Sequence, residues 1–335
     1  MKRVDMTMDG QYGSCGKGGI TGWLAKRLNY DTVVCAYGTQ AGHTYNDEDR
    51  GLHMMVQQLP VGVSGPGVKN VLIGPGALIH QETLEREIVA YMQPGQRLMI
   101  HEHAAVVTDA HAKAEKERGQ TKMGSTAKGV GLAAIDRILR DPDSKAVAKL
   151  GFKGTSLEQY VVSRFEYINQ LSKARRLLIE GAQGFGLSLY HGDWPYCTSR
   201  DVTPWQIAAD CGLPFQMAKE IMVWLAFRTF PIRVNNRDGS SGPGYPDQRE
   251  ITWESIGQQP ELTTVTKLPR RVFDFSLTQF EHAMYHCAGM DTKVVLTFAD
   301  YCTSEQLRNI HNLIRSTGHH VDYECWGPDD KDIRS

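Results

Sequence analysis

The sequence lacks the features that mark secreted, zinc-binding or membrane proteins. It contains only seven cysteines among 335 residues, an odd number, and no two of them lie within four residues of each other. This spacing argues against a zinc site and against a disulfide framework, and it favours a reducing compartment. The opening residues, MKRVDMTMDG, contain no apolar signal core, and the apolar run EIMVWLAF is far too short to cross a bilayer. We therefore expect a cytoplasmic protein that does not associate with a membrane.

An excess of positive charge is also missing. The 37 Lys and Arg residues are balanced by 38 Asp and Glu residues, which leaves a net charge of −1. A protein of this charge has no basic field to attract nucleic acid, so we expect small-molecule ligands bound at a local site. Hydrophobic residues make up 41% of the chain, and no linker or repeat interrupts it. The length allows one large domain or two modest ones, and because no linker is evident we expect a single domain over residues 1–335.

Short β-rich runs alternate with amphipathic helical stretches. We expect strands over residues 4–8, 31–38, 69–74, 97–102, 176–181, 293–300 and 319–327. We expect helices to begin near Lys17, Gln81, Ser156, Ser276 and Ser304. The alternation predicts an α/β fold with a mainly parallel central sheet and helices on both faces. The segment Arg237–Glu250 is rich in glycine and proline, and it predicts a surface loop.

A glycine-rich segment, GSCGKGG, follows the first predicted strand and opens the first predicted helix. Glycines let backbone N–H groups approach phosphate oxygens, the helix N-terminus favours negative charge, and Lys17 adds a positive charge. The segment departs from the Walker pattern because no Ser or Thr follows Lys17. Taken alone, a glycine-rich turn is more often only a turn.

Four further segments carry residues suited to nucleotide chemistry. YGTQAGHTY holds His43 beside a glycine, and histidine is the natural acid or base near neutral pH. KMGSTAKGVGL offers hydroxyls to an anion, and residues 179–201 place many polar side chains after a strand. TTVTKLPRR offers hydroxyls and cations for a carboxylate or phosphate. Each segment alone is equally typical of a solvated loop, so their order decides the interpretation.

Along the chain the motifs follow in the order GxxGKG, AGHT, GSTxKGxG, EGAQG…HGxxPYxTS and a final Thr/Arg segment. With its motifs in this order, the chain resembles the adenylosuccinate synthetase family. The resemblance runs from residue 9 to about residue 328. It implies a P-loop-like α/β fold and a ligase that joins aspartate to the 6-position of inosine monophosphate at the expense of GTP. The implied reaction passes through a 6-phosphoryl intermediate and requires Mg²⁺. The resemblance also implies a homodimer in which Arg140 crosses the interface to the 5′-phosphate.

The resemblance assigns residues to each ligand. It implies that the catalytic residues are Ser14, Lys17 and His43, with Ser14 and the Gly42 carbonyl near the metal. The residues that it places at the triphosphate are Gly13, Ser14, Gly16, Lys17, Gly18, Gly42, Thr44, Thr297, Asp300, Gly327 and Pro328. Those that it places at the nucleoside monophosphate are Ser14, Gln40, Ser125, Thr126, Arg140, Gln183, Leu187 and Thr198. The implied aspartate site contains Thr263, Thr264, Val265, Thr266 and Arg270.

Three departures from the family pattern indicate a different substrate. The family reads GDEGKGK, and its aspartate, which takes the proton from purine N1, is replaced here by Ser14. Serine is smaller and neutral, and it can accept a hydrogen bond from a 2-amino group, which would admit guanine. The guanine-reading TKLD appears as TFAD, with Phe298 in place of Lys, which favours ATP or dATP as the donor. The arginine near the ribose 2′-hydroxyl is Leu268 here, which suits a deoxyribose.

These departures resemble those of the viral branch of the family, so we predict an ATP-dependent ligase of dGMP and L-aspartate. The alternative enzyme is an ordinary adenylosuccinate synthetase that acts on inosine monophosphate with GTP or ATP. A P-loop-like NTPase switch would have no need for the EGAQG…PYCTS segment. A non-catalytic nucleotide-binding protein would bind tightly without aspartate-dependent release of phosphate.

Overall fold

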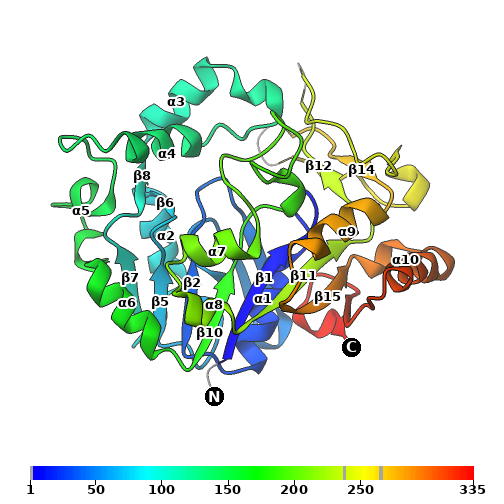
Figure 1. Ribbon diagram of the computed structural model, residues 1–335, viewed down its shortest axis with the longest axis horizontal. Helices are drawn as coiled ribbons and strands as arrows, with labels where there is room; N and C mark the ends of the chain where they lie inside the picture. The colour runs from blue at the N-terminus through cyan, green and yellow to red at the C-terminus, as the bar shows by residue number, and fades with distance from the viewer. Residues whose placement is uncertain (1–2, 237–238, 264–266) are drawn as a thin grey trace.

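The computed structural model describes residues 3–236, 239–263 and 267–335. Its centre is a ten-stranded sheet with the strand order β17-β16-β15-β11-β1-β10-β2-β5-β7-β9 (Figure 1). Neighbouring strands run parallel, except that β16 and β17 are antiparallel. The predicted α/β fold with a mainly parallel sheet is confirmed. The strands are β1 (Arg3–Asp9), β2 (Thr32–Cys35), β3 (His43–Asp47), β4 (Leu52–Val56), β5 (Asn70–Ile73), β6 (Leu78–His80), β7 (Arg97–His101), β8 (Ala105–Val107), β9 (Val161–Val162), β10 (Arg176–Glu180), β11 (Ile221–Arg228), β12 (Ile232–Arg233), β13 (Glu250–Ile251), β14 (Arg271–Phe273), β15 (Asp291–Thr297), β16 (Tyr323–Cys325) and β17 (Ile333–Arg334).

Helices cover both faces of the sheet because its central strands are apolar on both sides. In β11, Val223, Leu225 and Phe227 belong to one hydrophobic cluster, which also contains residues of α6, α7, α8, α9 and α10. Trp224 and Ala226 of the same strand belong to the other cluster, with residues of α1 and α2. The helices are α1 (Lys17–Arg27), α2 (Gln81–Tyr91), α3 (Asp109–Glu117), α4 (Val130–Leu139), α5 (Ala148–Gly151), α6 (Arg164–Lys173), α7 (Pro204–Asp210), α8 (Phe215–Ala218), α9 (Leu277–Tyr285) and α10 (Ser304–Ser316).

The helix predicted to begin near Ser156 is wrong. The structure begins α6 at Arg164, and the cap is Ser163, whose side chain accepts the backbone N–H of Glu166. The residues before this cap are used by the core and the sheet. Leu157 is fully buried, and β9 pairs in parallel with β7. β-branched residues suit such a strand better than a helix, so the short β9 displaces the first turns of the expected helix.

The order of the strands opens a crevice above β1. After β1 the chain moves two positions along the sheet to β2, and β10 later fills the gap between them. On the other side of β1 the chain adds β11 and then β15. Loops at the carboxyl ends of β1, β10 and β2 therefore diverge, which is where open α/β sheets bind ligands. Among the described helices, none is long and apolar enough to cross a membrane.

Candidate active site

A cavity of about 280 Å³ lies at this crevice and brings three of the sequence motifs together. Its walls are the glycine loop between β1 and α1, the segment between β2 and β3, and the start of the loop after β10. The residues that line it are Gly13, Ser14, Cys15, Gly16, Lys17, Gly18, Gln40, Ala41, Gly42, His43, Thr44 and Gln183. The segments that the sequence predicted for a triphosphate, an acid or base and a purine thus face one space.

The glycine loop is held in an unusual backbone conformation by its neighbours. Gly13, Ser14 and Gly16 have φ angles of 85°, 57° and 75°, in the left-handed region. A Cβ on Gly18 would lie 2.5 Å from the carbonyl oxygen of Thr44, so only glycine lets the loop pack against this strand. Ser14 is exposed to the cavity, whereas Cys15 beside it is fully buried. The loop therefore presents the serine, and not the thiol, to a ligand.

Lys17 begins α1 and is 5% exposed. Its Nζ lies 3.1 Å from Oδ2 of Asp9, the last residue of β1. Burial alone would lower the pKa of Lys17, but the charge of Asp9 and the hydrogen bond to it outweigh this effect, and the pKa is raised. The ammonium group therefore stays charged at neutral pH and can neutralise a phosphoryl group in the cavity.

His43 is oriented by a buried carboxylate. Its Nδ1 lies 2.5 Å from Oε1 of Glu180, the last residue of β10, and the two side chains are 5% and 1% exposed. The second oxygen of Glu180 accepts the backbone N–H of Val61 at 2.6 Å. Because a carboxylate accepts hydrogen bonds, this arrangement assigns the proton to Nδ1 and leaves Nε2 for the cavity. Glu180 thereby fixes the ring and can stabilise positive charge that develops on it.

Gln40 lines the cavity and follows Thr39, which contacts the KMGSTAKGVGL segment. Its Oε1 is buried and has no hydrogen-bond partner, which suits an amide that completes its contacts with a ligand. Thr39 Oγ1 donates to the carbonyl of Lys128 at 3.4 Å, so the two segments lie against each other. Gln40 thus lies next in the chain to a residue that contacts the predicted phosphate segment.

The N-terminus of α4 follows that segment but already holds a negative charge. The carboxylate of Glu115, on α3, accepts the backbone N–H groups of Gly129 at 2.7 Å and Gly131 at 2.8 Å. A helix N-terminus attracts anions, and here a protein carboxylate fills that place. A phosphate bound at this end of the site must therefore rely on side chains such as those of Ser125 and Thr126.

The loop after β10 carries Gln183, Leu187 and Thr198. Gln183 has a φ of 63°, and a Cβ on the next residue, Gly184, would lie 2.4 Å from the carbonyl oxygen of Gln11. The backbone N–H of Thr198 donates to the carbonyl of Leu187 at 2.7 Å, which brings these two predicted residues together. The loop is thus folded back on itself beside the glycine loop, with Gln183 at the cavity wall.

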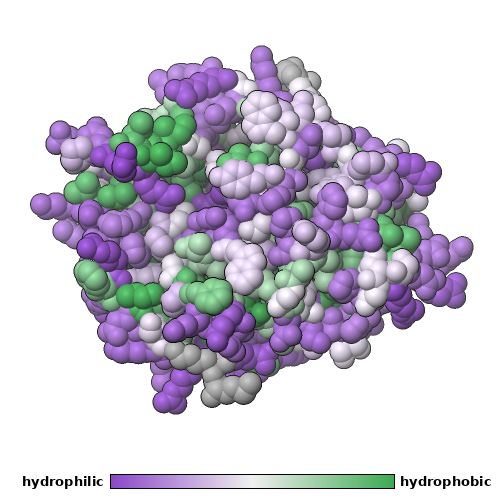
Figure 2. All heavy atoms as spheres, viewed as in Figure 1, coloured by the Kyte–Doolittle hydropathy of each residue, from purple (hydrophilic) through white to green (hydrophobic). Residues whose placement is uncertain are grey.

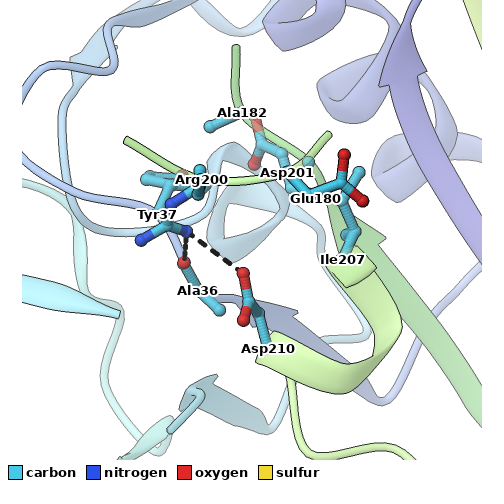
Figure 3. Close-up of a pocket in the computed structure, with 9 residues that line it drawn as sticks. Ala36, Tyr37, Glu180, Ala182, Arg200, Asp201, Ile207 and Asp210 are labelled. Carbon is cyan, nitrogen blue, oxygen red and sulfur yellow. Dashed lines mark hydrogen bonds and ion pairs between the residues drawn. The ribbon is translucent and has the colours of Figure 1, made fainter. Parts of the chain in front are cut away.

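A second pocket contains Glu180, the partner of His43, and shows how this loop is anchored. It is lined by Ala36, Tyr37, Glu180, Gly181, Ala182, Arg200, Asp201, Ile207 and Asp210 (Figure 3). Arg200 donates to the carbonyl of Ala36 and, at 2.9 Å, to that of Gly76, and it lies 3.5 Å from Asp210. Ala36 follows β2, Gly76 follows β5 and Asp210 ends α7, so Arg200 fixes the segment that contains Thr198 against the sheet.

The segments predicted for the donor adjoin the glycine loop from the other side. Thr297 ends β15, and a Cβ on Gly16 would lie 3.6 Å from its Cγ2. Asp300 follows Thr297 closely and is exposed. Near the C-terminus, the carbonyl of Pro328 accepts Asn46 Nδ2 at 3.2 Å, which ties Gly327 and Pro328 to β3. None of these predicted residues is among the described residues that line the cavity itself.

The predicted aspartate loop is described only at its base. Thr263 is buried, and its Oγ1 accepts the backbone N–H of Leu268 at 3.1 Å. Burial lowers the pKa of Arg270, and this arginine stays charged because its ordinary pKa is far above neutrality. The predictions for Thr264, Val265 and Thr266 lie outside the described residues. Arg140 is exposed at the end of α4 and is not among the described residues that line the cavity.

The sequence analysis missed Asp9 and Glu180, which hold Lys17 and His43. Both are acidic residues at the last position of a buried parallel strand, and each is followed by glycine, in MDG and IEG. A buried carboxylate in that position needs a polar partner, and this signal would have found both residues.

The oxygen atoms at the cavity wall fit Mg²⁺. Ser14 and Gly42 are exposed there, and nothing lies within 4 Å of the position that a Cβ of Gly42 would take. Mg²⁺ prefers oxygen ligands and is usually held by one or two protein groups, several waters and the phosphates of a substrate. The hydroxyl of Ser14 and the carbonyl of Gly42 match such a shell. Among the described residues, the acidic cluster close enough to hold an ion is Asp47, Asp49 and Asp330, and Lys26 already binds all three.

Comparisons with known proteins were made for the whole chain. Residues 7–143 and 141–311 match the model of the adenylosuccinate synthetase family. The chain is 42% identical to the N6-succino-2-amino-2′-deoxyadenylate synthase of Acinetobacter phage SH-Ab 15497, over 98% of this chain and 92% of the relative. It is 39% identical to the protein of the same name from Vibrio phage phiVC8, over 99% and 98% of the two chains. The structure matches the succinoaminodeoxyadenylate synthetase of cyanophage S-2L, bound to dGMP and dATP as an energy donor, with a TM-score of 0.92, 37% identity and coverage of 100% and 95%.

Proposed function

Because the chain belongs to the adenylosuccinate synthetase family, we propose that it ligates L-aspartate to the 6-position of dGMP, with ATP or dATP as the donor. The product is N6-succino-2-amino-2′-deoxyadenylate, as the names of the two phage relatives support. The cyanophage protein, which binds dGMP and dATP, supports the same substrates. The observation that carries the proposal is Ser14, which lines the cavity where the family has an aspartate. The enzyme acts in the cytoplasm of a phage host, where these nucleotides are available.

Ser14 selects a base with a 2-amino group. The residue is exposed on the cavity wall in the left-handed conformation, and Gln183 lines the same cavity. A neutral hydroxyl accepts a hydrogen bond from the amino group, and its small size leaves room beside C2 of the purine. An aspartate at this position would instead set a charge against N1 and crowd C2. The deoxyribose is accommodated because Leu268 offers no polar partner to a 2′-hydroxyl.

The first chemical step transfers a phosphoryl group to O6. The oxygen attacks the γ-phosphorus of the donor, the bond to the β-phosphate oxygen breaks, ADP or dADP leaves, and N1 gives up a proton. Lys17 neutralises the transferred group, and its contact with Asp9 keeps it charged and in place. His43 faces O6 through Nε2, and when the ring is also protonated there, with Nδ1–H held by Glu180, it donates to O6 and stabilises the negative charge that develops on this oxygen.

In the second step the amine of aspartate attacks C6, the C6–O6 bond breaks, phosphate leaves, and the amine loses a proton. Thr263 and Arg270 bind the carboxylates of aspartate, as do the predicted residues Thr264, Val265 and Thr266. Gln40, Ser125, Thr126 and Thr198 hold the 5′-phosphate and sugar, and Leu187 packs near the purine. Thr44, Thr297, Asp300, Gly327 and Pro328 hold the donor beside the glycine loop. Ser14 and Gly42 would hold Mg²⁺ together with the phosphates, and the ion would offset the negative charge of the phosphates.

The enzyme is a homodimer in which each Arg140 completes the site of the partner. Arg140 is exposed at the end of α4, and Ile138 and Leu139 before it are 68% and 67% exposed. Figure 2 shows a hydrophobic patch on the surface over α4. Exposed apolar patches of this kind mark interfaces, and an arginine at the edge of one can bind a phosphate with two hydrogen bonds.

Release of phosphate tests the proposed function. The purified protein is incubated with ATP or GTP against dGMP, GMP and inosine monophosphate, each with and without L-aspartate, and the products are identified by mass. We expect aspartate-dependent release with dGMP and ATP. Faster release with inosine monophosphate would make the chain an ordinary adenylosuccinate synthetase. Release that does not depend on aspartate, with any nucleotide, would refute the ligase.

A further inference from the structure

Arg228 is a buried cation that the steps above do not use. Its side chain is 1% exposed and stands at the carboxyl end of β11, the neighbour of β1 in the sheet. Removing a guanidinium group from water is costly unless its partners compensate, so the partners of a buried arginine indicate its role. The partners of Arg228 come from three loops that follow the ends of different strands.

The guanidinium group touches each of the three loops. Nη1 donates to the carbonyl of Ser14, in the glycine loop after β1, at 3.3 Å. Nη1 also lies 3.3 Å from Oε2 of Glu261, and Nη2 binds the other oxygen of that carboxylate. The flat face of the group lies over Phe298, with Cζ 3.6 Å from the centroid of the ring. Phe298 follows β15, between Thr297 and Asp300 of the donor segment.

Glu261 carries this contact to the base of the predicted aspartate loop. Its carbonyl accepts the backbone N–H of Arg270 at 2.7 Å, and the neighbouring residues Leu262 and Pro269 form a β-bridge. Glu261 is therefore tied to Arg270 through the backbone and to Arg228 through its carboxylate. The position of Arg270 relative to Ser14 depends on Arg228, because this one group holds both sides.

We propose that Arg228 is a positioning residue that couples binding of the amino acid to binding of the nucleoside triphosphate. The inference rests on the proposed function, because it takes Arg270 as a ligand of aspartate and the Phe298 segment as part of the donor site. Aspartate fixes Arg270 and with it Glu261. The planar guanidinium group of Arg228 then holds the glycine loop and Phe298 in the positions that binding of the triphosphate requires. A lysine cannot replace it, because a point charge neither binds a carboxylate with two parallel hydrogen bonds nor stacks on a ring in the same way.

The experiment compares wild type with Arg228→Lys, Glu261→Gln and a control, Arg3→Met. Arg3 binds Asp5 by a similar pair of contacts, at 2.6 and 3.1 Å, but at the amino end of β1, away from the cavity. The dissociation constant of L-aspartate is measured by calorimetry with dGMP present, without and with a non-hydrolysable ATP analogue. The KM values for aspartate and dGMP are measured in parallel, and thermal melting shows that each variant is folded.

We expect wild type and Arg3→Met to bind aspartate about tenfold more tightly when the analogue is present, within the usual range of coupling between sites. We expect Arg228→Lys and Glu261→Gln to lose this factor and to raise the KM for aspartate about tenfold, with the KM for dGMP changed less than twofold. The inference is overturned if Arg228→Lys or Glu261→Gln still binds aspartate about tenfold more tightly with the analogue, or if wild type shows no such tightening. A wild type that releases no phosphate with dGMP and aspartate overturns the proposed function instead.

Discussion

The substitution Ser14→Asp tests whether the glycine loop selects the purine. Ser14 has a φ of 57° and is exposed to the cavity, and aspartate accepts the left-handed region more readily than most residues. The backbone should therefore keep its conformation. The new carboxylate would face N1, which both dGMP and inosine monophosphate present as N–H. It would also fill space beside C2, where only dGMP carries an amino group. We expect the preference to move from dGMP toward inosine monophosphate.

The size of the shift follows from the one contact that differs between the two nucleotides. A lost hydrogen bond to a buried polar group costs about 1–3 kcal/mol, and about 1.4 kcal/mol is a factor of ten in a rate or equilibrium. The new charge would also act on Lys17 and Asp9, which lie 3.1 Å apart. That effect is the same for both nucleotides and cancels in their ratio. The expected change in the ratio of the two kcat/KM values is thus about tenfold or more.

The assay measures kcat/KM for dGMP and for inosine monophosphate, with ATP and L-aspartate saturating, in wild type, Ser14→Asp and Ser14→Asn. Asparagine has almost the size of aspartate but no charge, so it separates crowding beside C2 from the charge facing N1. A ratio that is unchanged in Ser14→Asp would refute the reasoning. It would mean that Ser14 does not select the base and that specificity lies elsewhere, near Gln183–Leu187.

Three further predictions concern catalysis, assembly and pH. His43→Ala should lower kcat by about 10²–10³-fold while nucleotides still bind. Glu180→Gln should lower kcat as well. Turnover like that of wild type in either variant would contradict the roles proposed for the pair. A mixture of inactive Arg140→Ala and inactive His43→Ala proteins should regain activity, because a hybrid dimer contains one intact site. A protein that sediments as a fully active monomer would rule out shared sites. Burial and the neighbouring His103 lower the pKa of His101 from 6.5 to about 4. As the pH falls below 6.5, His101 is protonated in the unfolded chain before it is protonated in the folded protein. The free energy of unfolding therefore decreases as the pH falls from 6.5 toward 4. Replacing His101 by Gln should remove about 2 kcal/mol of this loss at pH 5, which urea titrations at pH 7.5 and 5 would measure; an equal loss in both proteins would contradict the assignment.

The sequence predicted the parts of the fold that depend on local pattern. Helices begin at Lys17, Gln81 and Ser304 as expected, and the predicted start at Ser276 is the cap of α9. The motifs GSCGKGG, AGHT and EGAQG were found because each follows a strand whose carboxyl end fixes the loop, whereas KMGSTAKGVGL follows α3. The run EIMVWLAF, Glu220–Phe227, was considered only as a membrane segment, since a continuous apolar run has no period that distinguishes a strand from a buried helix. In the structure it is β11, next to β1.

The contacts that orient the candidate catalytic groups could not be predicted in the same way. His43 and Glu180 are 137 residues apart, and they meet only because β10 lies between β1 and β2. Arg228 ends β11 of the central sheet, whereas Glu261 lies 33 residues away between β13 and β14 of a separate three-stranded sheet. Spacing along the chain carries no information about such pairs. An acidic residue at the end of a buried strand indicates that the carboxylate needs a polar partner. The topology of the sheet decides which residue that partner is.

Backbone conformation gives one further link between the sheet and the site. Among the described residues, seven that are not glycine have positive φ, and six of them are Ser14, Ala127, Arg140, Gln183, Lys267 and Phe298. Every one of these six lies in a segment, or at a position, that the sequence analysis assigned to a ligand. A left-handed conformation costs such a residue about 1–2 kcal/mol, and it persists only where the surroundings determine it. The ends of β1, β10 and β15 supply that constraint for Ser14, Gln183 and Phe298. The sheet thus stabilises loop conformations that glycine would adopt more readily, and side chains can stand at those positions to contact a ligand.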